Sequence, residues 1–339
     1  MASFEILRTG MVTGVGLDAE SSCAAIRCGI SAFEETRFMF DGEWILGCEV
    51  PLEEPWRGRE KLLQMLCSSL RECLEGFSGT SSTEIPLLLS LPEADRPGRI
   101  EGLDGGFLGV VEERLGVRFH PESRFFANGR IGGVQALDYA RRLLAESVSL
   151  CLVAGVDSLL VARSLDEWHR QHRLLTAENS DGFIPGEAAA AVLLGRLGSG
   201  GTVRCAGMGY GNEPAPRGSG EANRADGLVQ AFRSALSDAS WKLGDVDLRL
   251  TDLSGEQFGF REAAVALTRL LRTRKEEFDL WHPADCVGET GAAVTPILLG
   301  VFAAAVAKNW APGPRAVCHV SGDGKERAAF LLETVGGQA

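Results

Sequence analysis

The stretch from Phe125 to Leu144 has the pattern of a short strand that turns sharply into a helix. Such an elbow commonly presents a catalytic nucleophile to the positive end of the helix dipole. Here the elbow carries Gly129 and Arg130, and it contains neither Ser nor Cys. A guanidinium is no nucleophile at neutral pH, and its charge opposes the dipole. The stretch therefore predicts the frame of an active site without its reactive atom.

Cysteine and histidine spacing gives no sign of a metal site. The nine cysteines are scattered and form no C-x-x-C pair, so we expect reduced and mostly buried thiols. His169 and His172 form an H-x-x-H step without a further ligand nearby in the sequence, and a solvated helix face explains them equally well. We predict no metal and no cofactor.

Composition limits the class of protein. The chain has 339 residues, 45% of them hydrophobic and 24% charged, with a formal net charge of −12. The negative charge argues against nucleic-acid binding. No apolar run reaches the roughly 18 residues of a membrane span, and the N-terminus lacks a signal-peptide pattern. These features predict a cytoplasmic protein with no membrane span.

The elements around the elbow alternate between strands and helices. Strands are predicted over 4–16, 86–91, 125–126, 147–154, 181–194, 202–210, 246–253, 316–320 and 328–333, with a hairpin within 36–52. Helices are predicted over 18–27, 59–77, 106–115, 131–144, 224–242, 259–273 and 291–306. The glycine-rich stretch 197–201 is the best candidate boundary. This pattern is typical of an α/β protein made of two similar halves.

Several motifs occur in an order that resembles a known family. They are TGMVTGVG at 9–16, the elbow, AGVDS at 154–158, DGFIPGEAAAAVLL at 181–194, GMGYG at 207–211, LSGEQFG at 253–259, CVGETGAAV at 286–294 and SGDGKERAAFLLE at 321–333. Together they resemble the β-ketoacyl-[acyl-carrier-protein] synthase family over nearly the whole chain. The resemblance implies an α/β, thiolase-like fold. Two similar βαβαβ-type halves, 1–197 and 198–339, would form a layered α-β-α-β-α sandwich.

The same resemblance implies that the catalytic residues are missing. The family uses a Cys nucleophile at the elbow and two histidines that stabilise charge developing on the thioester and the departing carboxylate. The Cys position falls on Gly129 or Arg130, the first His position on Ser254 and the second on Glu289; the family's lysine falls on Ala284. The chain is thus identified as a degenerate member that lacks the Cys-His-His triad.

Charged residues replace small or neutral ones around the implied pocket. The closing glycine-rich loop carries Lys325 and Glu326, and with Phe183 these are the candidate substrate-binding residues. Arg130 and Glu289 add further charge, so the pocket should be filled with salt bridges or serve another purpose. Cys286, three residues before Glu289, is interpreted as a small buried residue at a strand end.

Two classes of function remain open. In the first, the chain is a pseudoenzyme that serves as a binding, adaptor or chain-length-factor-like partner subunit in a bacterial fatty-acid or polyketide pathway. In the second, it is an acyltransferase, condensing or hydrolytic enzyme acting on acyl thioesters, with a relocated site at Asp252, Ser254 and Glu289. Ordinary polar residues at strand ends and loops are the competing interpretation of those three.

The resemblance also implies a partner. In this fold the strand before the elbow pairs with its two-fold mate, which would place Phe125 and Phe126 at a dimer interface. Alternatively, both phenylalanines belong to the core. The expected partners are a second thiolase-fold subunit, as a homodimer or heterodimer, and possibly an acyl carrier protein.

Overall fold

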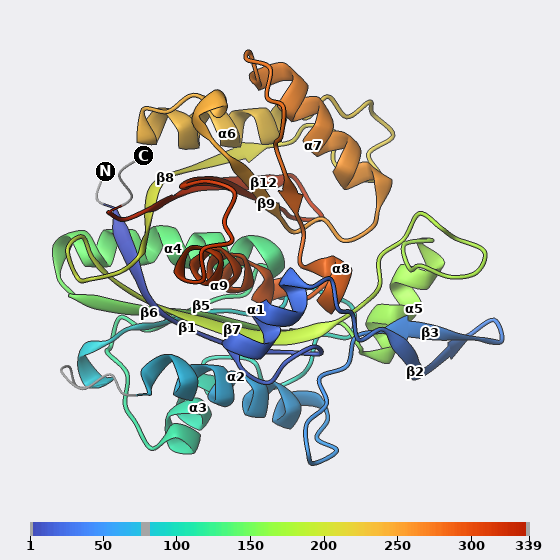
Figure 1. The fold of residues 1–339 in the computed structure, drawn as a ribbon. Coiled ribbons are helices and arrows are strands. Elements are labelled where there is room, and N and C mark those ends of the chain that lie inside the picture. The colour runs from blue at the N-terminus through green and yellow to red at the C-terminus, as the bar shows by residue number, and fades with distance from the viewer. Residues whose placement is uncertain (1–2, 76–81, 337–339) are drawn as a thin grey trace.

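The computed structural model describes residues 3–75 and 82–336 (Figure 1). Its strands are β1 (Phe4–Thr13), β2 (Glu34–Phe40), β3 (Glu43–Gly47), β4 (Leu87–Ser90), β5 (Arg124–Phe126), β6 (Leu150–Ser158), β7 (Glu187–Arg196), β8 (Val203–Asn212), β9 (Leu248–Thr251), β10 (Leu280–Trp281), β11 (Arg315–Ser321) and β12 (Glu326–Thr334). Its α-helices are α1 (Ala19–Arg27), α2 (Gly58–Leu74), α3 (Phe107–Leu115), α4 (Gly129–Glu146), α5 (Ala162–Arg170), α6 (Asp226–Ala239), α7 (Gln257–Leu270), α8 (Ala284–Val287) and α9 (Val294–Ala307).

Ten of these strands form one twisted sheet in the order β10-β9-β11-β12-β8-β1-β7-β6-β4-β5. The strands up to β7 make one half of the sheet, and the strands from β8 onward make the other. The halves join where Phe4–Ile6 of β1 pair antiparallel with Val203–Cys205 of β8. At the far end of the first half, β5 is the edge strand and pairs only with β4 within the described part of the chain.

The helices and the two halves of the sheet form five layers (Figure 1). Helices α2 and α3 cover the outer face of the first half, and α6 and α7 cover the outer face of the second. Helices α4 and α9 lie between the halves and contact strands of both. The predicted α/β layered sandwich is confirmed.

Hydrophobicity explains why these elements occupy the inner layers. Helix α9 (VTPILLGVFAAAVA) is apolar on all sides, as a helix enclosed between two sheet halves should be. Strands β6 and β7 are apolar on both faces because helices cover both, and they read as continuous hydrophobic runs. Across residues 3–75 and 82–336, even the most apolar helix is too short to cross a membrane.

The candidate boundary at 197–201 is a loop between β7 and β8 that the first strand holds in place. Glu5 of β1 is 3% exposed, and its carboxylate accepts N–H groups from Gly198, Gly200 and Gly201 at 2.8, 3.1 and 3.0 Å. The loop is therefore fixed to the continuous sheet. The division into domains 1–197 and 198–339 stays a prediction, and its last three residues lie outside the described chain.

Most predicted elements are present, with differences at polar segments. Helix α5 was not predicted because its sequence, ARSLDEWHR, is mostly polar and buries few side chains, among them Leu165. It packs on the predicted hairpin β2–β3, where Phe40 stacks on His169 at 5.1 Å. Strand β7 begins at Glu187 rather than Asp181. The predicted end of the 59–77 helix lies outside the described residues.

All nine cysteines are free thiols, and eight are buried, as predicted. The exception is Cys28, which is exposed. Cys286 lies in the short helix α8, so its predicted place at a strand end is wrong. Burial raises the pKa of the Cys286 thiol, which keeps this sulfur, the one nearest in sequence to Glu289, in its unreactive form.

Candidate functional site

The elbow has the backbone geometry of a nucleophile position but no room for a side chain. Gly129, the first residue of α4, has a φ of +51°, a conformation that favours glycine. A Cβ atom built on Gly129 would lie 1.8 Å from Glu93 Oε1. The Glu93 carboxylate therefore occupies the space that a nucleophilic side chain would need. The Gly129 N–H is also engaged, because it donates to the Leu91 carbonyl at 3.0 Å.

Glu93 is held in this position by a buried guanidinium. Arg96 Nε donates to Glu93 Oε2 at 2.7 Å, and the same guanidinium binds both oxygens of Asp157 at 2.8 and 2.7 Å. Asp157 is fully buried and also accepts the Ala292 N–H at 2.9 Å. Burial alone would lower the pKa of Arg96, but Asp157 and Glu93 raise it above its ordinary value. The guanidinium therefore stays charged and fixes Glu93.

Sequence analysis missed Glu93 and Arg96, although a topological signal was present. Both follow β4, which is parallel to β5 and β6. The carboxyl ends of parallel strands meet at one edge of a sheet, where ligand sites of α/β proteins lie. Charged residues directly after β4 therefore belong beside the elbow after β5 and beside Asp157 in β6.

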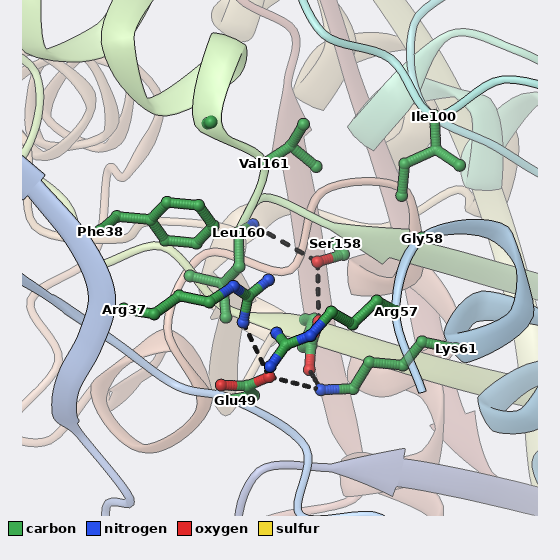
Figure 2. A pocket seen from close by; sticks show the side chains of 12 residues that line it. Arg37, Phe38, Glu49, Arg57, Gly58, Lys61, Ile100, Ser158, Leu160 and Val161 are labelled. Carbon is green, nitrogen blue, oxygen red and sulfur yellow. Dashed lines mark hydrogen bonds and ion pairs between the residues drawn. The ribbon is translucent and has the colours of Figure 1, made fainter. Parts of the chain in front are cut away.

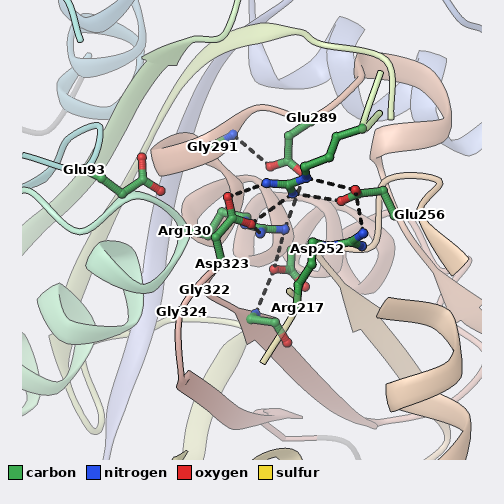
Figure 3. A network of polar contacts seen from close by, with 12 residues as sticks. Glu93, Arg130, Arg217, Asp252, Glu256, Glu289, Gly291, Gly322, Asp323 and Gly324 are labelled. Atoms are coloured by element: carbon green, nitrogen blue, oxygen red, sulfur yellow. Dashed lines mark hydrogen bonds and ion pairs between the residues drawn. The ribbon is translucent and has the colours of Figure 1, made fainter. Parts of the chain in front are cut away.

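Arg130, next to Gly129, is the centre of a network of ion pairs (Figure 3). Its guanidinium lies 2.6 Å from Asp323 Oδ1 and 3.5 Å from both Glu289 Oε2 and Asp252 Oδ2. Three carboxylates thus offset the unfavourable position of an arginine at a helix N-terminus. Charge does fill the region around the elbow, one of the two outcomes expected from the sequence.

Two further arginines extend the network. Arg173 binds both oxygens of Glu256 at 3.0 and 2.9 Å and also contacts Asp323 at 2.8 Å. Arg217, from the loop between β8 and α6, lies 3.2 Å from Glu256. Three guanidiniums therefore meet four carboxylates, and the carboxylates come from three connections of the fold, after β9, α8 and β11. None of these contacts is between neighbours in sequence.

The carboxylates of the network differ in the direction of their pKa shifts. Burial raises the pKa of Asp252 and of Glu289, although Arg130 opposes the rise in both. Burial acts in the same direction on Asp323, but Arg130 and Arg173 hold its pKa well below the usual range. Asp323 is therefore a fixed anion at neutral pH, whereas Asp252 and Glu289 are the groups that gain a proton first when Arg130 is weakened.

The three residues of the relocated-site hypothesis lie together. Ser254 is half-buried and hydrogen-bonds the Glu289 side chain, and Asp252 shares Arg130 with Glu289. Asp252 also accepts the Ser321 N–H at 2.8 Å. Asp252 and Glu289 therefore share one cation, and Glu289 also bonds the serine hydroxyl.

Of the three candidate substrate-binding residues, two line the cavity beside the elbow and one does not. Phe183 is 2% exposed, meets Trp168 edge-on at 5.3 Å and lies beneath the Arg173 guanidinium. Phe183 and Glu326 both line the cavity beside the elbow. Lys325 is exposed and lies outside the lining of this cavity, and its carbonyl accepts the Glu213 N–H. The structure therefore gives no support for placing Lys325 at the site.

The cavity beside the elbow measures about 800 Å³. Its lining contains four arginines (Arg96, Arg130, Arg173, Arg217) and six acidic residues (Glu93, Asp95, Glu167, Glu289, Asp323, Glu326). An apolar chain entering this space would displace water from charged groups without replacing its hydrogen bonds, which is costly. The lining is that of a charged crevice rather than of an acyl tunnel.

One histidine near the network was not considered a site residue. His319 Nε2 lies 2.8 Å from Thr251 Oγ1, next to Asp252 in the chain. Burial lowers the pKa of His319 to about 3, so its ring is neutral. It is 2% exposed and packs edge-on against Phe232. His319 is therefore a buried core residue.

Comparisons with known proteins place the fold. No family model matches the chain. A segment is 33% identical, over 172 residues, to "Actinorhodin polyketide putative beta-ketoacyl synthase 2" of Streptomyces coelicolor; the match covers 43% of this chain and 39% of that protein. The chain therefore spans well under half the length of the curated relative it matches. Over this segment, the chain is similar in sequence to a protein described as a putative β-ketoacyl synthase.

Solved structures match over almost the whole chain. The ishigamide ketosynthase/chain length factor has a TM-score of 0.81 at 16% identity, covering 99% of this chain and 100% of that one. A ketosynthase in complex with its chain length factor from Xenorhabdus doucetiae has a TM-score of 0.74 at 13% identity, covering 98% of both chains. These similarities confirm that this chain has the thiolase-like fold of ketosynthases.

Proposed function

We propose that this chain is a non-catalytic, thiolase-fold partner subunit, similar in role to a chain length factor. The observation that carries the proposal is the elbow, where Glu93 occupies the place of a nucleophilic side chain and Gly129 has none to offer. Acyl transfer to the elbow needs a nucleophile at that position. The chain presents a carboxylate there that is held by Arg96.

The surroundings of the elbow support the same conclusion. Stabilising a tetrahedral intermediate needs free N–H donors aimed at the developing oxyanion. The Gly129 N–H already donates to Leu91, and Arg130 is engaged by three carboxylates. Both features stabilise the fold of the elbow and support the proposal that it has no catalytic function.

The partner is proposed from what the similar structures contain. Those structures include a ketosynthase with its chain length factor, and an acyl carrier protein in complex with its ketosynthase. We propose that this chain pairs with an active ketosynthase of polyketide or fatty-acid synthesis through the edge strand β5. The three residues of β5, Arg124–Phe126, have a neighbouring strand on one side only in the described chain, so the backbone groups on their other side can bond a second strand.

The test is intact-mass analysis after incubation with malonyl and acyl donors on coenzyme A and on acyl carrier protein. An active ketosynthase treated in parallel serves as the positive control. We expect no covalent acyl adduct on this chain, while the ketosynthase is acylated stoichiometrically. An adduct mapped to Ser254 would overturn the proposal in favour of the relocated-site enzyme, and an adduct on any other residue would overturn both.

A further inference from the structure

A second cavity shares no lining residue with the cavity beside the elbow, although the segment that joins β6 to α5 contributes residues to both. Figure 2 shows this second cavity. It measures about 250 Å³ and is lined mainly by β2, the segment after β3, the start of α2, the end of β6 with the segment that follows it, and the first residue of β7. Its lining combines charged side chains with an apolar wall. These are Arg37, Glu49, Arg57, Lys61 and Glu187 on the charged side, and Phe38, Ile100, Leu160 and Val161 on the apolar side.

The charged side carries one positive charge in excess. Arg37 lies 3.2 Å from Glu49, and the Lys61 ammonium contacts Glu49 at 3.0 Å as well as the buried Glu187. These contacts pair two cations with two carboxylates. Arg57 is exposed and makes no ion pair within residues 3–75 and 82–336. Its guanidinium faces the same cavity (Figure 2).

The buried pair beneath the cavity keeps this charge pattern fixed. Lys61 is 7% exposed and Glu187 is 2% exposed. Glu187 also accepts the Val50 N–H at 2.9 Å and the Ser158 hydroxyl at 2.7 Å. Because Glu187 is so fully bonded, it balances Lys61 and cannot turn to neutralise Arg57. The excess charge is therefore available to a ligand.

The apolar side of the cavity favours a ligand that also has an apolar group. Phe38 and Val161 are half-buried and Leu160 is 4% exposed, so the wall is set in place before any ligand arrives. A ligand that fits both sides has a charged head and an apolar tail. Pockets with convergent polar groups on an apolar wall are the usual form of small-molecule sites.

We propose that this cavity binds a small organic carboxylate with a short apolar tail. A carboxylate matches the planar fork of the Arg57 guanidinium and carries the single charge that balances the excess. A phosphate dianion would leave the site with a net negative charge. An amine of the same length would face the unpaired guanidinium. The proposal concerns non-covalent binding and is independent of whether the chain pairs with a ketosynthase.

The test is calorimetric titration of the full chain at pH 7 with hexanoate, hexylamine and inorganic phosphate. We expect saturable binding of one hexanoate, and much weaker binding of the amine and of phosphate. Arg57→Ala should weaken hexanoate binding about tenfold or more. The matched control Arg59→Ala removes an exposed arginine two residues away that does not line the cavity, and it should leave the affinity unchanged.

A second variant tests the apolar wall. Ile100→Ala should weaken hexanoate binding and leave the weaker binding of acetate unaltered, because acetate has no tail to contact the wall. The proposal fails if hexanoate does not saturate, if Arg57→Ala binds it like the unaltered chain, or if phosphate or the amine binds as tightly. Arg57 is exposed and free of ion pairs in the described chain, so its loss should leave the fold intact.

Discussion

At the scale of single residues, the elbow is fixed by charged side chains from other parts of the chain. Gly129 keeps the left-handed backbone of the turn, while a carboxylate from another loop takes the space in front of it. Arg130 would be unfavourable at the start of α4 by itself. Its three carboxylate partners make it a link between α4 and the loops after β9, α8 and β11.

Replacing Arg130 should lower the free energy of unfolding by an amount that depends on pH. Arg130→Met leaves Asp252 and Glu289 buried beside each other without their cation, which should lower the free energy of unfolding by about 3 kcal/mol at pH 8. Arg130 lowers the pKa of both carboxylates, so its loss raises them further. An acid with a raised pKa in the folded state favours folding when protonated, and this stability is lost as pH rises through the raised value.

The loss caused by Arg130→Met should therefore be smaller at pH 5 than at pH 8, measured by urea unfolding at both values. The control is Arg170→Met, which removes an exposed arginine with two helical neighbours as partners. It should change stability little at either pH. A loss that grows on acidification would contradict the charge pattern assigned to the network.

At the scale of elements, one motif joins the two halves of the sheet. The DGF segment lies between α5 and β7 and contains no strand of its own. Asp181 Oδ1 accepts the Gln257 N–H at 2.6 Å, which satisfies a free donor at the start of α7 on the far half. Asp181 thus caps helix α7 from the other half of the fold. This structural role does not depend on catalysis.

Asp181→Ala should lower the free energy of unfolding by about 1 kcal/mol, the usual cost of losing an N-terminal cap. Asp181→Asn should restore most of it, because an asparagine side chain accepts the same hydrogen bond. Glu178→Ala, at an exposed acid three residues upstream, is the matched control and should leave stability unchanged. Equal losses in the alanine and asparagine variants would show that the carboxylate acts through its charge instead.

Local patterns predicted most elements, and long-range contacts explain what they missed. The apolar repeat of α4 and the continuous hydrophobic run of β6 are properties of neighbouring residues, so both follow from the sequence. The partners of Arg130 are more than a hundred residues away, and no periodicity brings them together. Glu93 was missed for the same reason, since only the parallel pairing of β4 with β5 places it at the elbow.

At the scale of the whole molecule, β5 is one of the two edge strands of the continuous sheet, and we propose that the chain associates through this edge. Phe125 packs against the core beneath the sheet and Phe126 against the core between its halves. Both side chains are only partly buried, and their place at a dimer interface stays a prediction. The open backbone of β5 and the exposed Arg124 remain for a partner strand.

Charge reversal at this edge tests the proposed pairing without disturbing the core. Arg124 is exposed and its guanidinium lies 4.3 Å from the centre of the Tyr139 ring, so Arg124→Glu changes the surface beside β5 and leaves the phenylalanines in place. We expect the dissociation constant of the dimer or of the complex with a ketosynthase to rise about tenfold, measured by sedimentation. Arg233→Glu makes the same change on α6, in the outer layer of the other half, and should have no effect. If both variants associate like the unaltered chain, the interface lies elsewhere. If Arg233→Glu alone weakens association, the partner covers α6, and β5 is not the edge through which this chain pairs.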